Sequence, residues 1–578
     1  MEQKKIEAKQ NMTGYPSIDK PWLKYYSEEA INISLPKCTI YEYIWKNNKD
    51  DLENVALNYF GRKITYGEMF ENIDKTAAAF SDEGIGAGDI VLGIAINIPE
   101  IIYSIYALNK IGAVSAWLDP RKSVDEIMDI VNSIHPKMVM LLDDAPEELL
   151  ERFTAVGART ISYSVQDSLP AAAKATMMSK SPDKKHKGTS YGDMIKNYAD
   201  VKSVDRTKSV KNPIALIVYT GGTTGASKGV MLSNENINSV VAQYVVSGVP
   251  LGRDHSWLTM GSTFIVYALI MGLHTPLSIG MTCYICLDFE VRAMEKIILD
   301  NRINHTMNTP MLWEYLIQSE LSKKADYSFL INPTVGADSM DINKEEEISD
   351  FLEQHNCKYP IIKGYGMTEV SSAVSVNVSK NINKIGSVGI PFCAMVISAF
   401  DPLTGEECRF DEQGEICITG PSVMAGYFDN KEATDEMIRR HSDGRLWLHS
   451  GDLGHIDSDG FLFIDGRLKR MIIDYIGFKI FAPAIETAIM DIAEIDKCCV
   501  VGSPDREHQR GQIAVAFVIA KQGVNTQQLV EKILKVCRDT LPSYSQPARI
   551  VFVEQFPYTG AGKVDYRALE KEAERTDD

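Results

Sequence analysis

Apolar and polar positions along the first 150 residues follow the periods of helices and strands in turn. Residues 64–85 carry Phe70 and Ile73 near one face of a predicted helix, and glycines follow it. Residues 89–96, DIVLGIAI, contain a short apolar run, and Pro99 marks the start of the next helix. Buried strands that alternate with helices are typical of a parallel sheet, so the pattern predicts an α/β architecture.

A glycine-rich loop follows the apolar segment 214–220, IALIVYT, whose β-branched residues predict a strand. Beyond the loop, Ser233 is a suitable helix N-cap, and apolar residues follow it at helical spacing: Ile237, Val240, Val241, Tyr244 and Val245. The pattern therefore predicts that the loop lies between a strand and a helix, where phosphate-binding loops are found.

Two further segments depart from this rhythm. Residues 256–287 contain no Asp, Glu, Lys or Arg, and this uncharged segment is long enough to span a membrane. However, Gly and Pro residues divide it into shorter pieces. We predict buried core elements there. Residues 167–212 are polar and rich in lysine, and they predict a solvated surface loop or insertion.

The length and charge of the chain limit its architecture and its partners. A chain of 578 residues predicts roughly three to four structural units. The net charge of −18 argues against nucleic acid and against anionic membranes as partners. An anionic ligand must therefore be held by local groups and not by the overall field.

The cysteines indicate a reducing compartment. Ten of them are scattered along the chain without the spacing of a disulfide framework. Cys283 and Cys286 form one CxxC without a second ligand pair, so a buried strand is a better interpretation than a zinc site. The N-terminus has no apolar run typical of a signal peptide. We expect a cytoplasmic protein.

The glycine-rich loop does not fulfil the Walker pattern of kinases and P-loop ATPases. That pattern requires a glycine directly before its lysine and a hydroxyl residue directly after it. Here Ser227 precedes Lys228 and Gly229 follows it. The glycines, the hydroxyls and one ammonium group still suit phosphate binding, although a plain flexible turn is the alternative.

The loop YTGGTTGASKGV (219–230) resembles the phosphate loop of the adenylate-forming superfamily, which comprises acyl- and aryl-CoA ligases, peptide-synthetase adenylation domains and luciferases. Other segments resemble further motifs of that family, in the family's order, over nearly the whole chain. These are GYGMTE (364–369), EICITGPSVMAGYFDN (415–430), HSGDLG (449–454), GRLKRMI (466–472) and TGAGKVDYR (559–567), with weaker matches at 64–70 and 384–391.

The resemblance implies a fold and a two-step reaction. It implies an α/β protein with a large multi-subdomain N-terminal domain, residues 1–466, and a small mobile α+β C-terminal domain, residues 467–578, with a hinge near Lys469. In the first step a carboxylate and ATP give an acyl-adenylate and pyrophosphate. In the second step CoA takes the acyl group and AMP is released. The cofactors implied are ATP, Mg²⁺ and CoA.

The resemblance also assigns nucleotide-binding residues. The phosphate loop would hold the β- and γ-phosphates, Tyr365 would stack on adenine, and Asp452 would accept hydrogen bonds from the ribose hydroxyls. Arg467 would contact ribose or phosphate. The ATP- and AMP-binding set implied is Thr220, Gly221, Gly222, Thr223, Thr224, Gly225, Lys228, Gly336, Ala337, Asp338, Gly364, Tyr365, Gly366, Met367, Asp452 and Arg467.

Three residues carry the implied chemistry. Lys563, which lies beside Gly560 and Gly562 in TGAGKVDYR, resembles the family's catalytic lysine, which bridges the carboxylate and the α-phosphate. Thr368 would contact the α-phosphate. Glu369 would bind Mg²⁺, a hard cation that prefers oxygen ligands.

The acid and the acceptor are less well defined. Phe264 is followed by Ile265 where amino-acid-activating members carry an Asp, so we expect an apolar or uncharged acid. The implied acyl pocket comprises Ile265, Val266, Tyr267 and Val335, and the implied CoA residues are Gly477, Phe478 and Lys479.

Several alternatives stay open at this stage. The enzyme could load a separate carrier protein in place of CoA, or the chain could be a non-catalytic nucleotide-binding protein of this fold. We expect a monomer or a homodimer that acts in fatty-acid or other carboxylic-acid metabolism.

Overall fold

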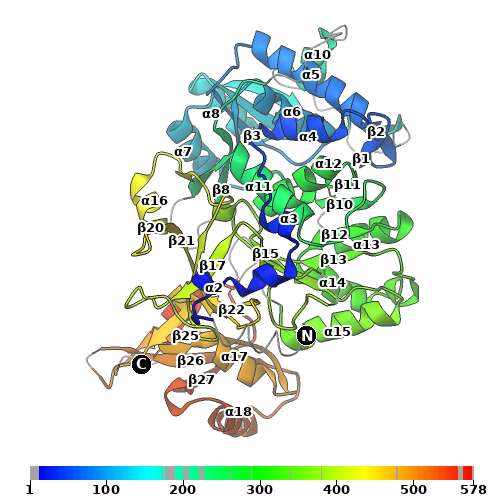
Figure 1. The fold of residues 1–578 in the computed structure, drawn as a ribbon. Coiled ribbons are helices and arrows are strands. Elements are labelled where there is room, and N and C mark those ends of the chain that lie inside the picture. Colours follow the sequence, from blue (N-terminus) through cyan, green and yellow to red (C-terminus); the bar gives the residue numbers. More distant parts are fainter. Residues whose placement is uncertain are drawn as a thin grey trace.

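The computed structural model describes residues 12–171, 173–175, 189–198, 206, 209–220, 227–260, 262–287, 290–338, 340–378, 381–476, 479–508, 510–557 and 564–575, with only the backbone of Thr220 and Lys479. The elements gather into parts that follow one another along the length of the molecule (Figure 1). Two large sheets with their helices form the upper and middle parts, and the last strands and helices of the chain form the lower end.

An eight-stranded sheet forms the upper part, in the order β19-β9-β8-β4-β3-β5-β6-β7. The neighbouring strands from β8 to β7 in this order are all parallel, as the apolar strands predicted in the first 150 residues indicate. The parallel pairs are β3–β4, β3–β5, β4–β8, β5–β6 and β6–β7. Its strands are β3 (Ile90–Ile94), β4 (Val114–Trp117), β5 (Met138–Leu142), β6 (Arg159–Tyr163), β7 (Thr189–Ser190), β8 (Ile214–Thr220), β9 (Lys228–Ser233) and β19 (Gly426–Tyr427).

Local capping signals begin the helices of this part. Thr65 and Glu68 form a capping box at the start of α5, and Pro99 occupies the first turn of α6, as predicted. The helices here are α4 (Ile40–Asn48), α5 (Tyr66–Asp82), α6 (Pro99–Lys110), α7 (Val124–Ile134), α8 (Glu147–Ala155), α10 (Tyr191–Lys196) and α11 (Asn234–Val245), and the short α2 (Pro16–Asp19), η1 (Pro21–Tyr25) and α3 (Glu28–Ile31) precede them.

The residues on the two sides of the glycine-rich loop form antiparallel strands, so a strand and not a helix begins at Lys228. Residues 228–233, KGVMLS, form strand β9, which pairs antiparallel with β8 from Ile214↔Ser233 to Thr220↔Lys228. From Val230 to Ser233, buried and partly exposed side chains alternate, as in a strand with one buried face. The prediction that a helix directly follows the loop was therefore wrong, because strand β9 comes first. The predicted N-cap is confirmed: Ser233 caps α11, and Asn236 completes a capping box.

The prediction for residues 167–212 was wrong in part. Within the described portion, β7 adds an edge strand to the sheet and α10 follows it. Tyr191 and Met194 of α10 are buried, and the Tyr191 ring stacks on Tyr163 at 4.8 Å between centroids. Two apolar side chains at helical spacing sufficed to dock this helix although its surroundings are polar.

A nine-stranded sheet forms the middle part, in the order β16-β15-β14-β13-β12-β10-β11-β1-β2. The strands are β1 (Val55–Tyr59), β2 (Arg62–Thr65), β10 (Ser256–Met260), β11 (Thr282–Cys286), β12 (His305–Asn308), β13 (Asn332–Val335), β14 (Ile362–Tyr365), β15 (Ser375–Val376) and β16 (Ile390–Pro391). The helical segments are η2 (Tyr267–His274), α12 (Thr275–Ile279), α13 (Val291–Asp300), α14 (Pro310–Gln318), η3 (Ser322–Lys324) and α15 (Ile342–Gln354).

The uncharged segment 256–287 is core, as predicted. It supplies β10, the π-helix η2, α12 and β11, and Cys283 lies fully buried in β11. Among the described residues, no helix combines the length and apolarity needed to cross a membrane. All ten cysteines are free thiols.

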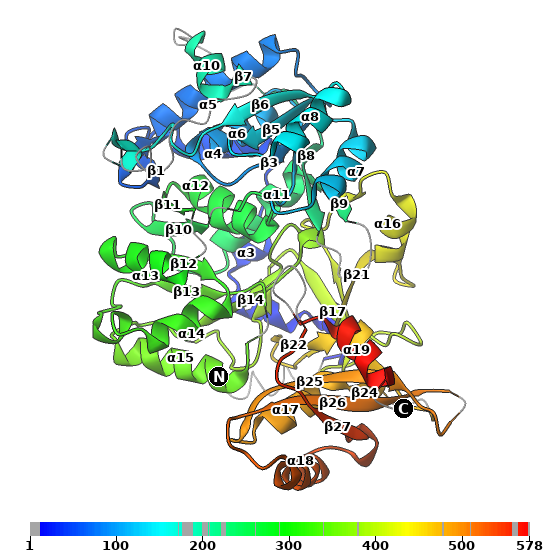
Figure 2. The ribbon, with the colours of Figure 1, turned by 180° about the vertical axis from the view of Figure 1, so that it is seen from behind.

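An antiparallel sheet and the C-terminal elements complete the fold. The sheet comprises β17 (Val396–Phe400), β18 (Gly414–Thr419), β20 (Ile438–Arg440), β21 (Leu446–Ile456) and β22 (Leu462–Arg467), with α16 (Lys431–Met437) beside it. The lower end contains η5 (Leu468–Arg470), β23 (Met471–Ile473), β24 (Lys479–Phe481), α17 (Ala482–Met490), β25 (Ile495–Pro504), β26 (Gln512–Ala520), α18 (Thr526–Thr540), η6 (Ser543–Ser545), β27 (Arg549–Phe552) and α19 (Tyr566–Arg575). Figure 2 shows α19 on the rear side, above β25 and β26.

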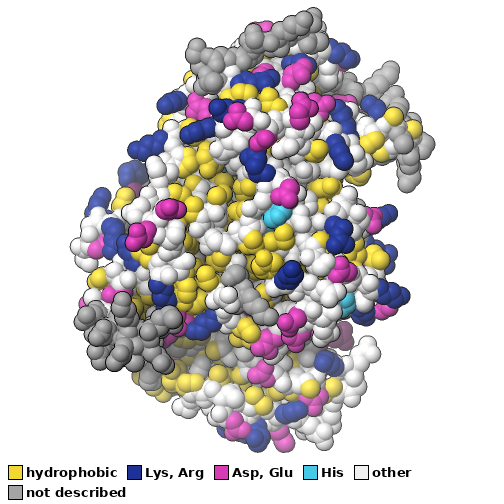
Figure 3. All heavy atoms as spheres, turned by 45° about the vertical axis from the view of Figure 1, so that its right-hand side comes forward, with side chains coloured by type: hydrophobic (Ala, Val, Ile, Leu, Met, Phe, Trp, Pro, Cys, Tyr) yellow, Lys and Arg dark blue, Asp and Glu magenta, His cyan; other side chains and the backbone are white. Residues whose placement is uncertain are grey.

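The surface agrees with an acidic protein that carries no single basic face in the view shown. Figure 3 shows side chains of both charges scattered over this face, with apolar side chains between them. Together with the net charge of −18, this arrangement leaves anion binding to local groups.

Candidate functional site

The GYGMTE segment forms a tight loop after β14, and Gly366 makes that loop possible. A β-carbon on Gly366 would lie 1.7 Å from the backbone oxygen of Ser372. Ser371 and Ser372 both adopt positive φ angles, 58° and 102°. This close chain reversal presents Thr368 and Glu369 at the start of the short helix η4 (Thr368–Val370). Any side chain at position 366 would force the loop open.

Glu369 joins three segments that are far apart in the sequence. Its Oε1 accepts a hydrogen bond from the Tyr427 hydroxyl at 2.9 Å, and its backbone oxygen accepts one from the Met424 amide at 2.8 Å. The Lys228 ammonium lies 5.0 Å from the centre of the Tyr427 ring. The glycine-rich hairpin, the GYGMTE loop and the 415–430 motif therefore meet around one carboxylate.

The carboxylate of Glu369 is buried, and the positive charges of Arg467 and Lys228 act on it only weakly. Burial raises the pKa of its carboxyl group, while the Tyr427 hydroxyl and the charges of Arg467 and Lys228 act in the opposite direction. A carboxylate that is buried with one neutral donor lacks a close counter-charge, so a cation can bind it favourably.

Asp452 forms a second polar centre together with Tyr365 and Arg467. Its Oδ2 accepts a hydrogen bond from the Tyr365 hydroxyl at 2.5 Å, and its Oδ1 lies 2.8 Å from Arg467 Nε. Asp452 and Arg467 are direct partners across the β21–β22 pair. Burial raises the pKa of Asp452, and the Arg467 charge opposes that shift. An ionised carboxylate has further lone pairs with which to accept hydroxyl donors.

Gly336 and Tyr267 lie against one another at the end of β13. A β-carbon on Gly336 would lie 3.1 Å from the Tyr267 hydroxyl. The Gly336 amide donates a hydrogen bond to the backbone oxygen of Asn308 at 3.0 Å. Ala337 and Asp338 follow as exposed residues, and Ala337 has a φ of 66°. This brings one residue of the predicted acyl pocket next to one of the predicted adenine site.

The other predicted acyl-pocket residues are distributed over two cores. Val266 is buried in the large core that also contains Tyr244 and Trp257. Val335 is buried in a separate cluster with Trp313. Ile265 is 37% exposed and belongs to neither. Of these predicted pocket residues, Tyr267 contacts the predicted adenine site at Gly336, whereas the Val335 side chain packs in a separate core cluster.

Several predicted residues lie outside the described portion. These are Gly221, Gly222, Thr223, Thr224 and Gly225 of the phosphate loop, Gly477 and Phe478 of the CoA set, and Lys563; for Thr220 and Lys479 only the strand positions are described. Lys469 is exposed in η5, which directly follows β22. The roles of all these residues stay predictions.

Two residues at the site, Tyr427 and Lys122, were not predicted from the sequence. Tyr427 bonds Glu369, and its motif, EICITGPSVMAGYFDN, was the signal that could have indicated it. Lys122, in the loop before α7, donates from Nζ to the Ser227 hydroxyl at 3.1 Å and so brings a second ammonium to the phosphate hairpin. No local pattern connects Lys122 with a loop 105 positions further on.

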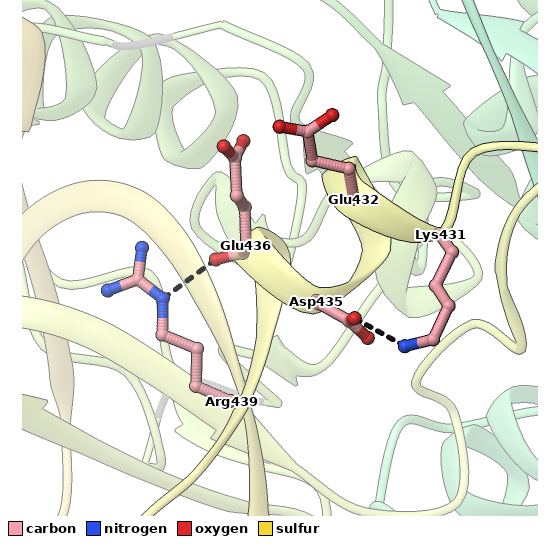
Figure 4. A pocket seen from close by; sticks show the side chains of 5 residues that line it. All are labelled: Lys431, Glu432, Asp435, Glu436 and Arg439. Atoms are coloured by element: carbon pink, nitrogen blue, oxygen red, sulfur yellow. Dashed lines mark hydrogen bonds and ion pairs between the residues drawn. The ribbon is translucent and has the colours of Figure 1, made fainter.

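A surface depression along α16 has no part in this site. Its lining residues, shown in Figure 4, are Lys431, Glu432, Asp435, Glu436 and Arg439. Lys431 pairs with Asp435, and Arg439 Nε donates to the Glu436 backbone oxygen at 2.8 Å. These contacts are local to one helix and its end, as on an ordinary solvated helix face.

The family follows from comparison with known proteins. Residues 44–428 match the sequence model of the AMP-binding enzyme family, and residues 484–563 match that of the AMP-binding enzyme C-terminal domain. The chain therefore belongs to the AMP-binding enzyme family. The predicted adenylate-forming family and the predicted fold class are confirmed, as is an AMP-forming acid–thiol ligase as the class of enzyme.

The relatives match this chain over most of their length, and a solved structure shares its fold. A long-chain-fatty-acid–CoA ligase of Bacillus subtilis is 26% identical over 567 residues, 96% of this chain and 98% of the relative. The 4-coumarate–CoA ligase-like protein 8 of Arabidopsis thaliana is 27% identical and covers 87% of this chain and 86% of its own length. ATP-bound MatB from Rhodopseudomonas palustris has the same fold, with a TM-score of 0.78, 22% identity and coverage of 93% and 99%.

Proposed function

We propose that this protein activates a carboxylic acid with ATP and transfers the acyl group to CoA. The carrying observation is the pair of buried carboxylates at the site. Glu369 lies near Lys228 and beside Tyr427, and Asp452 lies between Tyr365 and Arg467. The first centre suits a metal and phosphates, and the second suits ribose hydroxyls. The CoA ligases among the relatives support CoA as the acceptor.

In the proposed first step, a carboxylate oxygen of the acid attacks the α-phosphorus of ATP. The bond from the α-phosphorus to the bridging oxygen breaks, and pyrophosphate leaves with that electron pair. Lys563 and Thr368 stabilise the charge on the α-phosphate and on the attacking carboxylate, while the phosphate hairpin with Lys228 binds the leaving pyrophosphate. In the second step the CoA thiolate attacks the acyl carbonyl carbon, and AMP leaves.

Mg²⁺ fits the donor set at Glu369. The Glu369 carboxylate is an oxygen donor, and burial raises its pKa, so a bound cation would stabilise its ionised form. Mg²⁺ would neutralise phosphate charge there, and we propose Glu369 as its protein ligand.

We also propose a division at residue 466, with Lys469 as the hinge. Residues 1–466 would hold ATP and the acid, and residues 467–578 would supply Lys563 for the first step and Gly477, Phe478 and Lys479 for the thiol. A narrow crevice beside Lys469 lies within residues 467–578 and is lined by Lys469, Arg470, Val500, Gln512, Tyr566 and Glu570. Few residues need to change conformation for such a rotation.

Arg470, directly after the proposed hinge residue, is held in place by three contacts within the C-terminal part. Its guanidinium pairs with Glu486, donates to the Val500 oxygen at 3.2 Å and lies 4.2 Å from the centre of the Tyr566 ring. Arg470 thus binds the start of the C-terminal part to β25 and α19. We infer that rotation occurs before Arg470, at Lys469, and that the elements beyond it move together.

The acid and the location in the cell belong to the same proposal. An apolar or uncharged acid suits the residues around Tyr267 and Val266, and the fatty-acid and coumarate ligases among the relatives support it. We propose a cytoplasmic site of action because the cysteines are unpaired, although one relative, an Arabidopsis thaliana OPC-8:0-CoA ligase, is named as peroxisomal.

A panel of carboxylic acids tests the reaction. We expect AMP and pyrophosphate, not ADP, to form from ATP with the preferred acid, and CoA to accelerate AMP release. ADP formation would contradict the ligase. AMP release that ignores CoA and requires a carrier protein would favour the alternative acceptor, and no turnover with any acid would favour a non-catalytic nucleotide-binding protein.

Lys563→Ala tests the assignment of the catalytic lysine. Acid-dependent exchange of pyrophosphate into ATP should be lost, while thioester formation from supplied acyl-adenylate should persist. Lys571→Ala, at an exposed position of helix α19, is the matched control and should keep both activities. Full exchange activity in Lys563→Ala would contradict the assignment.

A further inference from the structure

Three metal-ligating side chains converge on the antiparallel sheet, outside the nucleotide site. They are Cys417 on β18, His449 on β21 and His441, which directly follows β20. Their ligand atoms all lie within 4.8 Å of one another. Cys417 and His449 are direct partners across the β18–β21 pair, and the hairpin from β20 to β21 brings His441 beside them.

The imidazole of His449 is oriented by a carboxylate. Glu415 Oε2 lies 2.7 Å from His449 Nδ1, and Glu415 Oε1 accepts a hydrogen bond from the Gly451 amide at 3.1 Å. A carboxylate only accepts, so His449 Nδ1 carries the proton and Nε2 presents a lone pair. Carboxylates hold metal-binding histidines in this way.

The Nε2 lone pair of His449 points at the second imidazole. His449 Nε2 and His441 Nε2 are 2.9 Å apart, and the Cys417 sulfur belongs to the same group of ligand atoms, all within 4.8 Å of one another. Two nitrogens bound to one tetrahedral zinc ion lie about 3.3 Å apart, so a small outward shift would admit the ion. The described surroundings offer His441 Nδ1 no hydrogen-bond partner, although this atom is buried.

Aromatic packing holds His441 in place for this contact. Its ring meets Phe400 edge to face at 4.5 Å between centroids and is stacked on Trp447 at 5.8 Å. Cys417 is fully buried, whereas His441 and His449 are partly exposed, His449 with 11% of its side chain accessible. These packed rings reduce the freedom that metal binding would otherwise have to remove.

We propose that Cys417, His441 and His449 bind one divalent transition-metal ion of the zinc type, with Glu415 as the residue that orients His449. Sulfur and imidazole donors select Zn²⁺ over the hard Mg²⁺, so this site is distinct from the magnesium site proposed at Glu369. The fourth position is left for water or another small ligand.

The location of the ion suggests what it does. His449 lies three positions before Asp452 on β21, and Glu415 also binds the Gly451 amide. The ion would therefore join β18 to the β20–β21 hairpin directly behind the carboxylate that is proposed to bind ribose. It is a structural brace and takes no part in the acyl-transfer steps.

Metal titration of the full untagged chain tests the site. After chelation and under a phosphine reductant, one equivalent of Co²⁺ should bind and give a thiolate-to-cobalt absorption band, and Zn²⁺ should displace it even with excess Mg²⁺. Cys417→Ser should lose the band. His441→Ala should weaken Zn²⁺ binding by more than about tenfold, and Glu415→Gln by about tenfold to a hundredfold.

Two matched variants control for adventitious binding. Cys38→Ser removes a half-buried thiol elsewhere, and His455→Gln removes another histidine of β21, which faces Asp465. Both should bind Co²⁺ and Zn²⁺ like the unchanged protein. If Cys417→Ser fails to fold, His441→Ala alone decides, because its side chain is half-buried. Absence of the band in the unchanged chain, or unchanged affinity in His441→Ala, would overturn the proposal. Neither readout depends on ligase activity.

Discussion

The two buried carboxylates of the site, Glu369 and Asp452, are compensated in different ways. Asp452 has a guanidinium 2.8 Å from one oxygen and a phenol hydroxyl on the other. Glu369 has one neutral hydroxyl donor at 2.9 Å, while Lys228 lies beyond it, over the Tyr427 ring. This difference fits the two roles that we propose, ribose hydroxyl binding for Asp452 and cation binding for Glu369.

The largest effect should come from Glu369→Gln. The amide keeps the shape of the side chain but cannot supply the charge for Mg²⁺, so we expect pyrophosphate exchange to fall about 100- to 1,000-fold. Tyr427→Phe is the control, since it removes only the neutral hydroxyl and should cost far less. Equal losses in the two variants would show that Glu369 is held for packing and not for a metal.

A smaller effect is expected from Asp452→Asn. Loss of charge-assisted hydrogen bonds to ribose should raise the KM for ATP by on the order of tenfold to a hundredfold. The matched substrate is 2′-deoxy-ATP, which should be poor for the unchanged enzyme but should lose most of that handicap in the variant. A handicap of the same size in both proteins would contradict ribose binding by Asp452.

The raised pKa of Glu369 predicts a pH dependence of stability. Because burial favours the protonated form in the folded protein, this residue stabilises the fold fully below the pKa of an unfolded glutamate. That contribution is lost as the pH rises through the folded pKa. Thermal unfolding without ATP or metal should show it, and Glu369→Gln should flatten this part of the profile. A profile unchanged by the substitution would contradict the assignment.

The smallest effect is expected from Arg467→Gln. The Arg467 side chain is 61% exposed, so its ion pair with Asp452 should contribute less than about 1 kcal/mol to the free energy of unfolding. We expect the KM for ATP to rise by no more than about fivefold. A loss as large as that of Asp452→Asn would mean that the predicted contact of Arg467 with ribose or phosphate matters as much as the Asp452 carboxylate.

Much of the fold was predictable because its signals are local. The strand β8, the start of α6 at Pro99 and the cap of α11 at Ser233 each depend on a few neighbouring residues. The order of the motifs likewise predicted the family, which the match over residues 44–428 confirms. Local patterns failed at residues 228–233. The sequence predicted that a helix would follow the loop, but this segment forms a strand because it pairs antiparallel with β8.

The sequence by itself determined which chemical groups this protein carries, and in which order. Only the tertiary structure decided which of them meet. Tyr427 reaches Glu369 across 58 positions, Lys122 reaches Ser227 across 105, and Cys417 faces His449 across 32. Such contacts depend on strand register and on the packing of separate elements, and neither can be predicted from a short stretch of sequence.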